Sequence, residues 1–162
     1  MHDVRIGFGY DSHRFQAGRR LVLCGVEVPC DAGLAGHSDA DAATHAVIDA
    51  LFGAAALGDI GSHFPDSDDR WLGADSAGLL AEAVREVRDA GWAVGNVDVT
   101  IICERPKIGP HVGAMRSRLA AILGVGADAV SVKGKTDEGM GAVGAGEGVV
   151  AHAVCILKGD GR

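Results

Sequence analysis

The sequence predicts a single α/β sandwich of ferredoxin-like character, with helices packed on one face of a mixed sheet. Residues 97–103 alternate apolar and polar side chains, as a strand with one buried face does. Residues 40–56 instead repeat apolar side chains at helical spacing. A chain of 162 residues can bury a core of its own, so we expect one domain over 1–162.

The N-terminal half predicts short strands followed by a helix. Strands are expected at three places, namely 4–8, 21–23 and 26–28, the last two as a hairpin. The helix covers 40–56, with Ser38 or Asp39 as its N-cap. One polar face of this helix carries residues four apart: Asp41, His45 and Asp49.

The C-terminal half predicts alternating helices and strands. A loop over 58–73 leads to a second helix, which Asp75 or Ser76 caps and Gly91 ends. Pro110 opens a third helix that stops at Gly124. The expected strands of this half cover 97–103, 130–133 and 149–157.

Composition excludes several classes of function. The formal net charge is −7 and no run of lysine or arginine occurs, which argues against nucleic-acid and anionic-membrane partners. The four cysteines lie far apart without a CxxC pair, so neither a disulfide framework nor a zinc ribbon is indicated. No apolar run approaches the ~20 residues of a membrane span, and the N-terminus lacks a signal core. We therefore expect a cytoplasmic protein.

The stretch GKTDEGMGAVGAGEG, residues 134–148, resembles the end of a phosphate-binding P-loop. A P-loop requires a further glycine at position 129, which is Ala129. The alternation of Val130, Ser131 and Val132 also predicts a strand that runs directly into Gly134. The sequence therefore argues against an NTPase.

Asp11, His13 and His45 form a candidate metal site. Residues two apart in an extended backbone point to the same side, so Asp11 and His13 present a carboxylate and an imidazole together. One carboxylate and two imidazoles with an open fourth position are typical of a catalytic zinc. The alternative is a turn stabilised by Asp11, with His45 on a solvated helix face.

Three further segments suggest ligand contacts, each with a simpler alternative. His37 precedes the expected helix, where free backbone amides could meet an anion, or it is incidental to a capping loop. The acidic loop 59–68 offers acceptors for the hydroxyls of a polyol, or is an acidic turn. The segment 105–111 places Lys107 near a helix start, or is a proline-stiffened connection.

These residues resemble a known family. GYDSHRF, the long block GHSDADAATHAVIDALFGAAALGDIGSHFPDSD, GNVDVTII with RPKIGPH, KTDEG and GEG are similar to motifs of the 2-C-methyl-D-erythritol 2,4-cyclodiphosphate synthases of the non-mevalonate isoprenoid pathway. The resemblance runs from about residue 5 to the C-terminus. It implies a homotrimer of ferredoxin-like subunits with active sites between neighbours. The implied activity converts 4-diphosphocytidyl-2-C-methyl-D-erythritol 2-phosphate to the cyclic diphosphate and CMP.

The resemblance also implies roles for individual residues. It gives Asp11, His13 and His45 to Zn²⁺, and Glu138 to a second divalent ion, Mg²⁺ or Mn²⁺. His37 and Thr136 would stabilise the transition state. Ser38 would bind the substrate, and its methylerythritol part would contact Asp59, Ile60, Gly61, Phe64, Pro65, Asp66, Ser67 and Asp68. The cytidine and its phosphate would contact Cys103, Glu104, Arg105, Pro106, Lys107, Ile108, Gly109, Lys135, Thr136 and Asp137.

The glycine-rich segment departs from the family pattern. Ala142 and Ala145 stand where many members carry an aromatic residue and an arginine near the trimer axis. Glu147 then has no obvious partner, so we expect isoprenoid diphosphates to bind poorly there. Two rival functions remain open at this point: a zinc-dependent phosphohydrolase that uses the same three ligands, and a metal-binding trimeric scaffold without activity.

Overall fold

The computed structural model describes residues 3–65, 67–71, 73–159 and 161. Its strands are β1 (Val4–Ala17), β2 (Leu21–Leu23), β3 (Val26–Val28), β4 (Ala32–Leu34), β5 (Trp92–Ile102), β6 (Val130–Lys135) and β7 (Gly148–Gly159). Its helices are α1 (Ala42–Ala55), α2 (Ile60–His63), α3 (Ser76–Asp89), α4 (Val112–Leu123) and α5 (Gly141–Gly144). Single 3₁₀ turns lie at Asp69–Trp71, Gly109–His111 and Ala127–Ala129.

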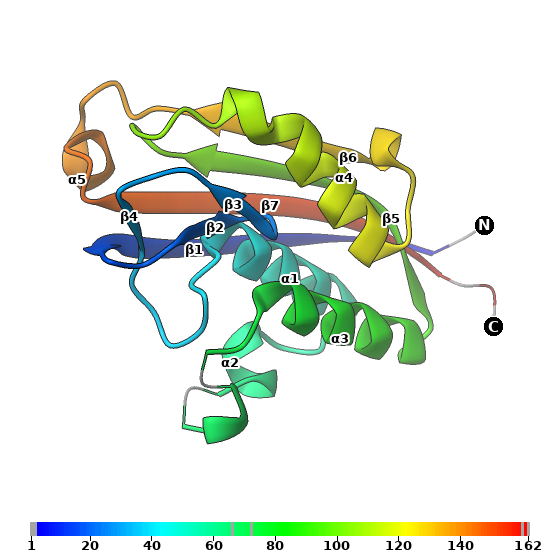
Figure 1. Cartoon of the computed structure of the whole chain (residues 1–162). Helices are drawn as coiled ribbons and strands as arrows, with labels where there is room; N and C mark the ends of the chain where they lie inside the picture. The colour runs from blue at the N-terminus through cyan, green and yellow to red at the C-terminus, as the bar shows by residue number, and fades with distance from the viewer. Residues whose placement is uncertain (1–2, 66, 72, 160, 162) are drawn as a thin grey trace.

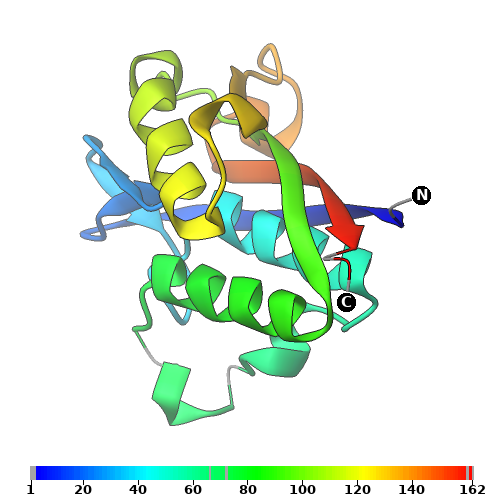
Figure 2. The ribbon, with the colours of Figure 1, turned by 90° about the vertical axis from the view of Figure 1, so that its right-hand side faces the viewer.

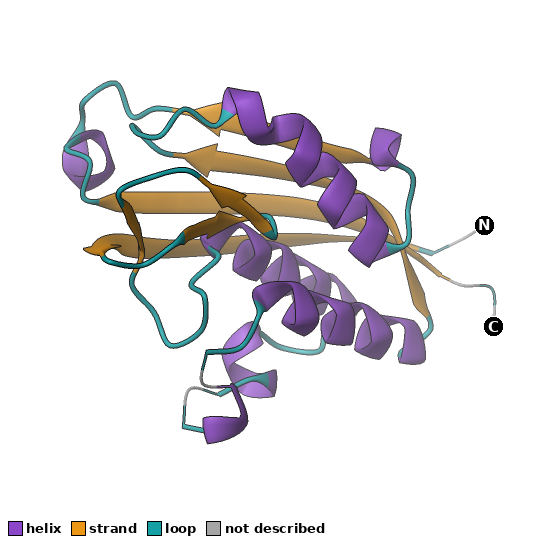
Figure 3. Cartoon of the chain, in the orientation of Figure 1, coloured by secondary structure: helices purple, strands orange, loops and turns teal. Residues whose placement is uncertain are grey.

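The main sheet is mixed, and the long helices cover one of its faces. Its five strands follow the order β4-β1-β7-β5-β6, while β2 and β3 form a separate hairpin. β7 is antiparallel to both β1 and β5, and β6 is parallel to β5. Figures 1, 2 and 3 show α1, α3 and α4 on the same side of this sheet. The expected layering and the expected hairpin are confirmed.

The register across the sheet fixes how far apart its two ends lie. Asp11 on β1 is opposite Ala151, which is opposite Ile101, which is opposite Gly134 on β6. Three strand spacings of about 4.8 Å separate β1 from β6 at this level, or roughly 14 Å. Side chains beside Asp11 and side chains beside Gly134 of the same chain are therefore too far apart to bind the same small group of a ligand.

The first strand is longer than the sequence predicts. The expected strand at 4–8 continues to Ala17, because β7 pairs with it from Val4 to Arg14 and β4 pairs with it from Phe15 to Ala17. Beyond Gly9 its side chains lack an apolar alternation, so its sequence pattern gave no strand signal. Asp11 and His13 consequently lie in regular strand and not in a turn.

The first helix begins later than expected, at an N-cap of Asp41 and not of Ser38 or Asp39. The Asp41 carboxylate is fully buried and accepts hydrogen bonds from Thr44 N, the Thr44 hydroxyl, Cys24 N and Gly25 N. Burial raises the pKa of Asp41, and the hydrogen bonds from Thr44 and Gly25 act in the opposite direction. Asp41 therefore joins the β2–β3 turn to the helix, as its buried N-cap and not as part of a polar face along it.

The remaining helices agree with their predictions apart from the start of α4 and the helical turns within the expected loop. Asp75 caps α3, and Gly124 ends α4 in the left-handed conformation at φ 71°. Pro110 opens a 3₁₀ turn, and α4 follows from Val112. The expected loop at 58–73 contains α2 and a 3₁₀ turn. None of the helices in the described part of the chain is both long and apolar enough to cross a membrane.

Two glycines allow α1 to lie directly on β1. A Cβ on Gly7 would lie 1.8 Å from Ala50 O, and one on Gly9 would lie 1.8 Å from Ala46 O. Ala46 and Ala50 are themselves fully buried. Small residues on both surfaces thus bring the two backbones together, which aligns the first turns of α1 with the middle of β1.

The opposite face of the sheet is uncovered and partly apolar. Its alternate β1 side chains are largely exposed: Val4 (57%), Ile6 (72%), Phe8 (61%) and Tyr10 (50%). Val154 on β7 is 41% exposed. A contiguous apolar face of this kind is typical of a surface that packs against another protein chain.

We predict that Gly7→Ala destabilises the fold, because its Cβ would collide with the backbone of α1. The expected loss in the free energy of unfolding is about 2 kcal/mol or more, since overpacking a close contact commonly costs 1–3 kcal/mol. Gly53→Ala in α1 is the matched control, because the nearest atom to its Cβ would be Phe8 O at 4.0 Å. Urea unfolding measures both, and equal stabilities would contradict the close contact.

Candidate metal centre

β1 and α1 bring Asp11, His13 and His45 together. Asp11 Oδ2 lies 2.9 Å from His13 Nε2 and 3.0 Å from His45 Nδ1. One ligand atom from each residue lies within 4.8 Å of the others, as a shared metal ion requires. The His45 side chain is only 11% exposed, so it does not lie on a solvated helix face. The grouping predicted from the sequence is confirmed.

The far nitrogen of each imidazole is also engaged. His13 Nδ1 lies 2.6 Å from Ala35 O, which fixes the tautomer with Nε2 free to bind a metal. His45 Nε2 lies 2.9 Å from the Ser76 hydroxyl, and that hydroxyl donates to Asp39. Metal-binding histidines almost always have such a partner. The donor set and its supports therefore fit a zinc ion with an open position.

Ser76 and Asp39 were not predicted from the sequence as parts of this site. Asp39 also accepts from Ser76 N and from Asp41 N, so three hydrogen bonds hold its carboxylate at the start of α3. Ser76 is fully buried. The sequence indicates Asp39 and Ser76 only as possible helix caps. A capping pattern does not predict that these two side chains form a hydrogen bond with each other.

Asp11 and His13 shift each other's pKa in the absence of a metal. Burial raises the pKa of Asp11, but hydrogen bonds from His13 and His45 outweigh it and leave this pKa at about 2. The hydrogen bond to Asp11 raises the pKa of His13. A metal ion binds an ionised carboxylate and neutral imidazoles. Its binding would therefore keep Asp11 ionised and require His13 and His45 to be neutral.

A cavity of about 370 Å³ opens beside the three ligands. The residues around it include several that the resemblance gives to the substrate: His37, Ser38, Ile60, Gly61, Phe64 and Pro65. Asp59, Ser67 and Asp68 do not line it. Asp59 caps α2, and Asp68 pairs with Arg70. Asp66 lies outside the described residues.

His37 does not lie at a helix end. The helix starts at Ala42, and the Asp41 side chain accepts the hydrogen bond of Thr44 N. The expected contact of an anion with His37 and the amides of the first turn is therefore not supported. Instead, Arg19 donates to Gly36 O and Ser38 O on either side of His37. Arg19 thus positions the His37 loop, a role that the sequence did not suggest.

A second cavity, of about 410 Å³, lies at the ends of β5 and β6. It is lined by Cys103, Lys107, Ile108, Gly109, Pro110, Gly134, Lys135, Thr136 and Glu138. The Thr136 hydroxyl donates to Glu138 Oε1 at 2.8 Å. Arg105, Pro106 and Glu104 do not line this cavity, and Glu104 Oε1 instead accepts from Asp137 N at 2.8 Å. Gly134 and Lys135 belong to β6, which is the reason that no P-loop forms.

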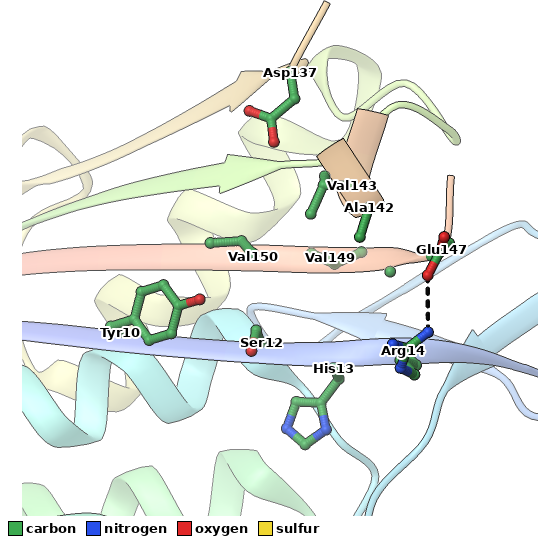
Figure 4. A pocket seen from close by; sticks show the side chains of 11 residues that line it. Tyr10, Ser12, His13, Arg14, Asp137, Ala142, Val143, Glu147, Val149 and Val150 are labelled. Carbon is green, nitrogen blue, oxygen red and sulfur yellow. Dashed lines mark hydrogen bonds and ion pairs between the residues drawn. The ribbon is translucent and has the colours of Figure 1, made fainter. Parts of the chain in front are cut away.

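A third hollow, of about 490 Å³, lies against the uncovered side of β1 and β7. Asp137 lines this hollow and not the second cavity. Figure 4 shows Ala142 and Val143 of α5 above β7, and an ion pair that joins Arg14 to Glu147. The Arg14 Nη1–Glu147 Oε2 distance is 2.8 Å. The expectation that Glu147 has no partner is therefore wrong: an arginine from β1 neutralises it.

We predict that His45→Ala and Asp11→Ala each fold but purify with little zinc, because two remaining ligands bind a metal weakly. Neither change removes an apolar side chain from the core. Elemental analysis after dialysis measures the zinc content. Full occupancy in either variant would contradict the ligand assignment.

We further predict that Ser76→Ala weakens zinc binding by about 10–100-fold, the usual effect of removing a partner of a metal-bound histidine. Ser131→Ala is the matched control, because Ser131 is exposed on β6. Competition with a fluorescent zinc chelator measures both dissociation constants. An unchanged constant in Ser76→Ala would show that this hydroxyl does not support His45.

Comparison with known proteins agrees with this geometry. The chain is 60% identical over 156 residues to 2-C-methyl-D-erythritol 2,4-cyclodiphosphate synthase of Laribacter hongkongensis, covering 96% of each chain. A solved structure of 2C-methyl-D-erythritol-2,4-cyclodiphosphate synthase in its CDP-bound form matches with a TM-score of 0.87 and 43% identity, covering 94% of this chain and 99% of that one.

A further match is the bifunctional IspDF of Campylobacter jejuni, with a TM-score of 0.94 and 36% identity. That match covers 98% of this chain, and the chain spans only 43% of the bifunctional protein. The model of the YgbB family matches residues 4–158, nearly the whole chain. The chain therefore belongs to the YgbB family.

Proposed function

We propose that this chain converts 4-diphosphocytidyl-2-C-methyl-D-erythritol 2-phosphate to 2-C-methyl-D-erythritol 2,4-cyclodiphosphate with release of CMP. The observation that carries the proposal is the Asp11–His13–His45 cluster, which opens onto a cavity in a chain of the YgbB family. A similar structure binds CDP, which supports a cytidine nucleotide as part of the substrate. The enzyme class is a phosphorus–oxygen lyase.

The reaction needs no strong base on the protein. An oxygen of the substrate's own 2-phosphate forms a bond to the β-phosphorus, and the bond from that phosphorus to the oxygen of CMP breaks. CMP leaves with the electron pair, so atoms and electrons balance without a co-reactant. The obstacle is the approach of one anion to another, which calls for positioning and positive charge.

The two cations would supply the positive charge that an acidic protein lacks. Asp11, His13 and His45 would hold Zn²⁺, and Glu138 would hold Mg²⁺ or Mn²⁺. Lys107 and Lys135 add fixed positive charge around the second cavity. The Thr136 hydroxyl, now bonded to Glu138, is placed to donate to a phosphate oxygen once the carboxylate has another partner.

The two cavities take the two ends of the substrate. His37 and Ser38 would contact the phosphates beside the first cation, with Ile60, Gly61, Phe64 and Pro65 around the methylerythritol. The cytidine would occupy the cavity formed by Cys103, Lys107, Ile108, Gly109 and Lys135. Burial raises the pKa of Cys103 to about 11, so its thiol is neutral and acts through packing and not as a nucleophile.

The separation of these cavities favours active sites between subunits. Within one chain about 14 Å of sheet lies between Asp11 and Gly134, too far for two cations to meet on one diphosphate. A neighbouring chain packed on the exposed face of β1 and β7 would supply the missing half. We therefore propose a homotrimer, which sedimentation equilibrium tests through the mass in solution.

Phosphorus NMR of the reaction mixture tests the proposed function. Incubation of the metal-loaded protein with the diphosphocytidyl substrate should give the two coupled signals of a cyclic diphosphate together with CMP. A zinc-dependent phosphohydrolase would instead open the diphosphate without forming a ring. A scaffold without activity would leave the substrate unchanged, and either of these results would overturn the proposal.

We predict that Glu138→Gln keeps zinc bound but lowers turnover by about 10²–10³-fold, the usual cost of one electrostatic contact made in the transition state. Thr136→Ala should lower turnover similarly and leave both metals bound. Glu27→Gln on the β2–β3 hairpin is a charge-matched control, because Glu27 is exposed and paired with Arg20. Turnover of Glu138→Gln near that of the wild type at saturating Mg²⁺ would exclude the role.

A further inference from the structure

His63 joins three parts of the chain beside the metal cavity. Its ring stacks on the fully buried Phe52 of α1, with centroids 4.0 Å apart and planes 16° from parallel. Its Nε2 lies 2.8 Å from Leu57 O, and its Nδ1 lies 2.7 Å from Glu86 Oε2 of α3. The side chain is only 20% exposed. None of these contacts involves a ligand of the candidate metal centre.

Both partners of the ring are acceptors. A backbone carbonyl can only accept, and an ionised carboxylate can only accept. The hydrogen bond to Leu57 O and the ion pair with Glu86 therefore exist together only when the His63–Glu86 pair holds one proton more than a neutral imidazole beside a carboxylate. When that proton leaves, one ring nitrogen turns a lone pair toward an oxygen, and the corresponding bond is lost.

Acidic groups lie near His63 on α3 and at the start of α2. Glu86 faces it from α3, and Asp59 lies at the N-cap of α2. Hydrogen bonds from Ser62 lower the pKa of Asp59, and the positive charge of His63 adds to that effect. On α1, Asp49 Oδ1 accepts from Ile60 N at 2.8 Å. The carboxylates of Glu86 and Asp59 therefore attract a positive charge on the ring.

The segment held by His63 forms one wall of the metal cavity. Ile60, Gly61, Phe64 and Pro65 all line that cavity. Figures 1 and 3 show α2 below α1 and α3, on the side of these helices away from the sheet. The Asp49–Ile60 bond fixes the start of this segment, and the ring contact of Phe64 with Phe52 fixes its end. Between them, His63 makes the contacts to α1 and α3.

We propose that His63 is a positioning residue whose protonated ring fastens segment 57–65 to α1 and α3, and that this fastening is released as pH rises. The wall of the metal cavity is then in place at pH values below the release, and it is displaced at pH values above it. The expectation that this displacement weakens substrate binding rests on the proposed function. The release of the segment does not depend on it.

Glu86→Gln tests whether the contact between His63 and α3 can be kept without the extra proton on the ring. A glutamine amide can donate to the unprotonated Nδ1 of a neutral His63, while Nε2–H still donates to Leu57 O. This variant should keep segment 57–65 fastened without the extra proton. Glu82→Gln is the matched control, since Glu82 lies one turn earlier on α3 and pairs with Arg85. His63→Leu removes both bonds at all pH values.

Amide hydrogen exchange followed by NMR measures the release without substrate. The reporting amides are Ser62 N and Phe64 N, which bond to Asp59 O and Ile60 O. Gly124 N at the end of α4 is the internal reference. In the wild type and Glu82→Gln, protection relative to intrinsic exchange should fall about tenfold or more between pH 6 and pH 9, the ratio expected for one charge-assisted hydrogen bond. In Glu86→Gln it should stay constant.

Two results would overturn the proposal: the same pH dependence in Glu86→Gln as in the wild type, or wild-type protection of both reporters in His63→Leu. If His63→Leu does not fold, the Glu86→Gln comparison still decides. With active enzyme, His63→Leu should raise the KM about tenfold and leave kcat nearly unchanged, with zinc still bound. A chain that shows the exchange pattern but forms no cyclic product would contradict the proposed function alone.

Discussion

The contact between α1 and β1 is the constraint on which the metal centre depends. Gly7 and Gly9 leave no side chain between the strand and the carbonyls of Ala50 and Ala46. His45 is the residue before Ala46, and Asp11 is two residues beyond Gly9 on the same face of β1. The distance between His45 and Asp11 is therefore set by backbone packing, and the side chains need little freedom to reach each other.

Buried polar groups then fix the orientation of what the backbone brings together. Asp41 ties the start of α1 to the β2–β3 turn, and Asp39 and Ser76 tie it to the start of α3. The same network ends at His45 Nε2, so the cap of one helix and the tautomer of one ligand depend on each other. Such a network places each ring before a metal arrives, which reduces the ordering that binding must impose.

Local patterns predict much of this fold, and they fail where a feature depends on distant partners. The three ligands, the hairpin, the start of α3 and the end of α4 follow from spacing and capping rules. The length of β1 does not, because its outer part is a strand only through pairing with β7 and β4. The partners of His45 and Glu147 lie 31 and 133 positions away, and no rule of sequence spacing connects them. Family resemblance adds roles for the residues but not these contacts.

The affinity of Gly9→Ala for zinc tests the central claim most directly. A Cβ at this position would push α1 from β1 and move His45 away from Asp11, although no ligand or ligand partner is changed. We expect zinc to bind about tenfold more weakly or worse in the folded variant, as when a ligand's support is removed. Gly53→Ala, on the same helix with space for its Cβ, should bind zinc as the wild type does. Wild-type affinity in folded Gly9→Ala would contradict the account, because the backbone contact would then not be what holds the three ligands together.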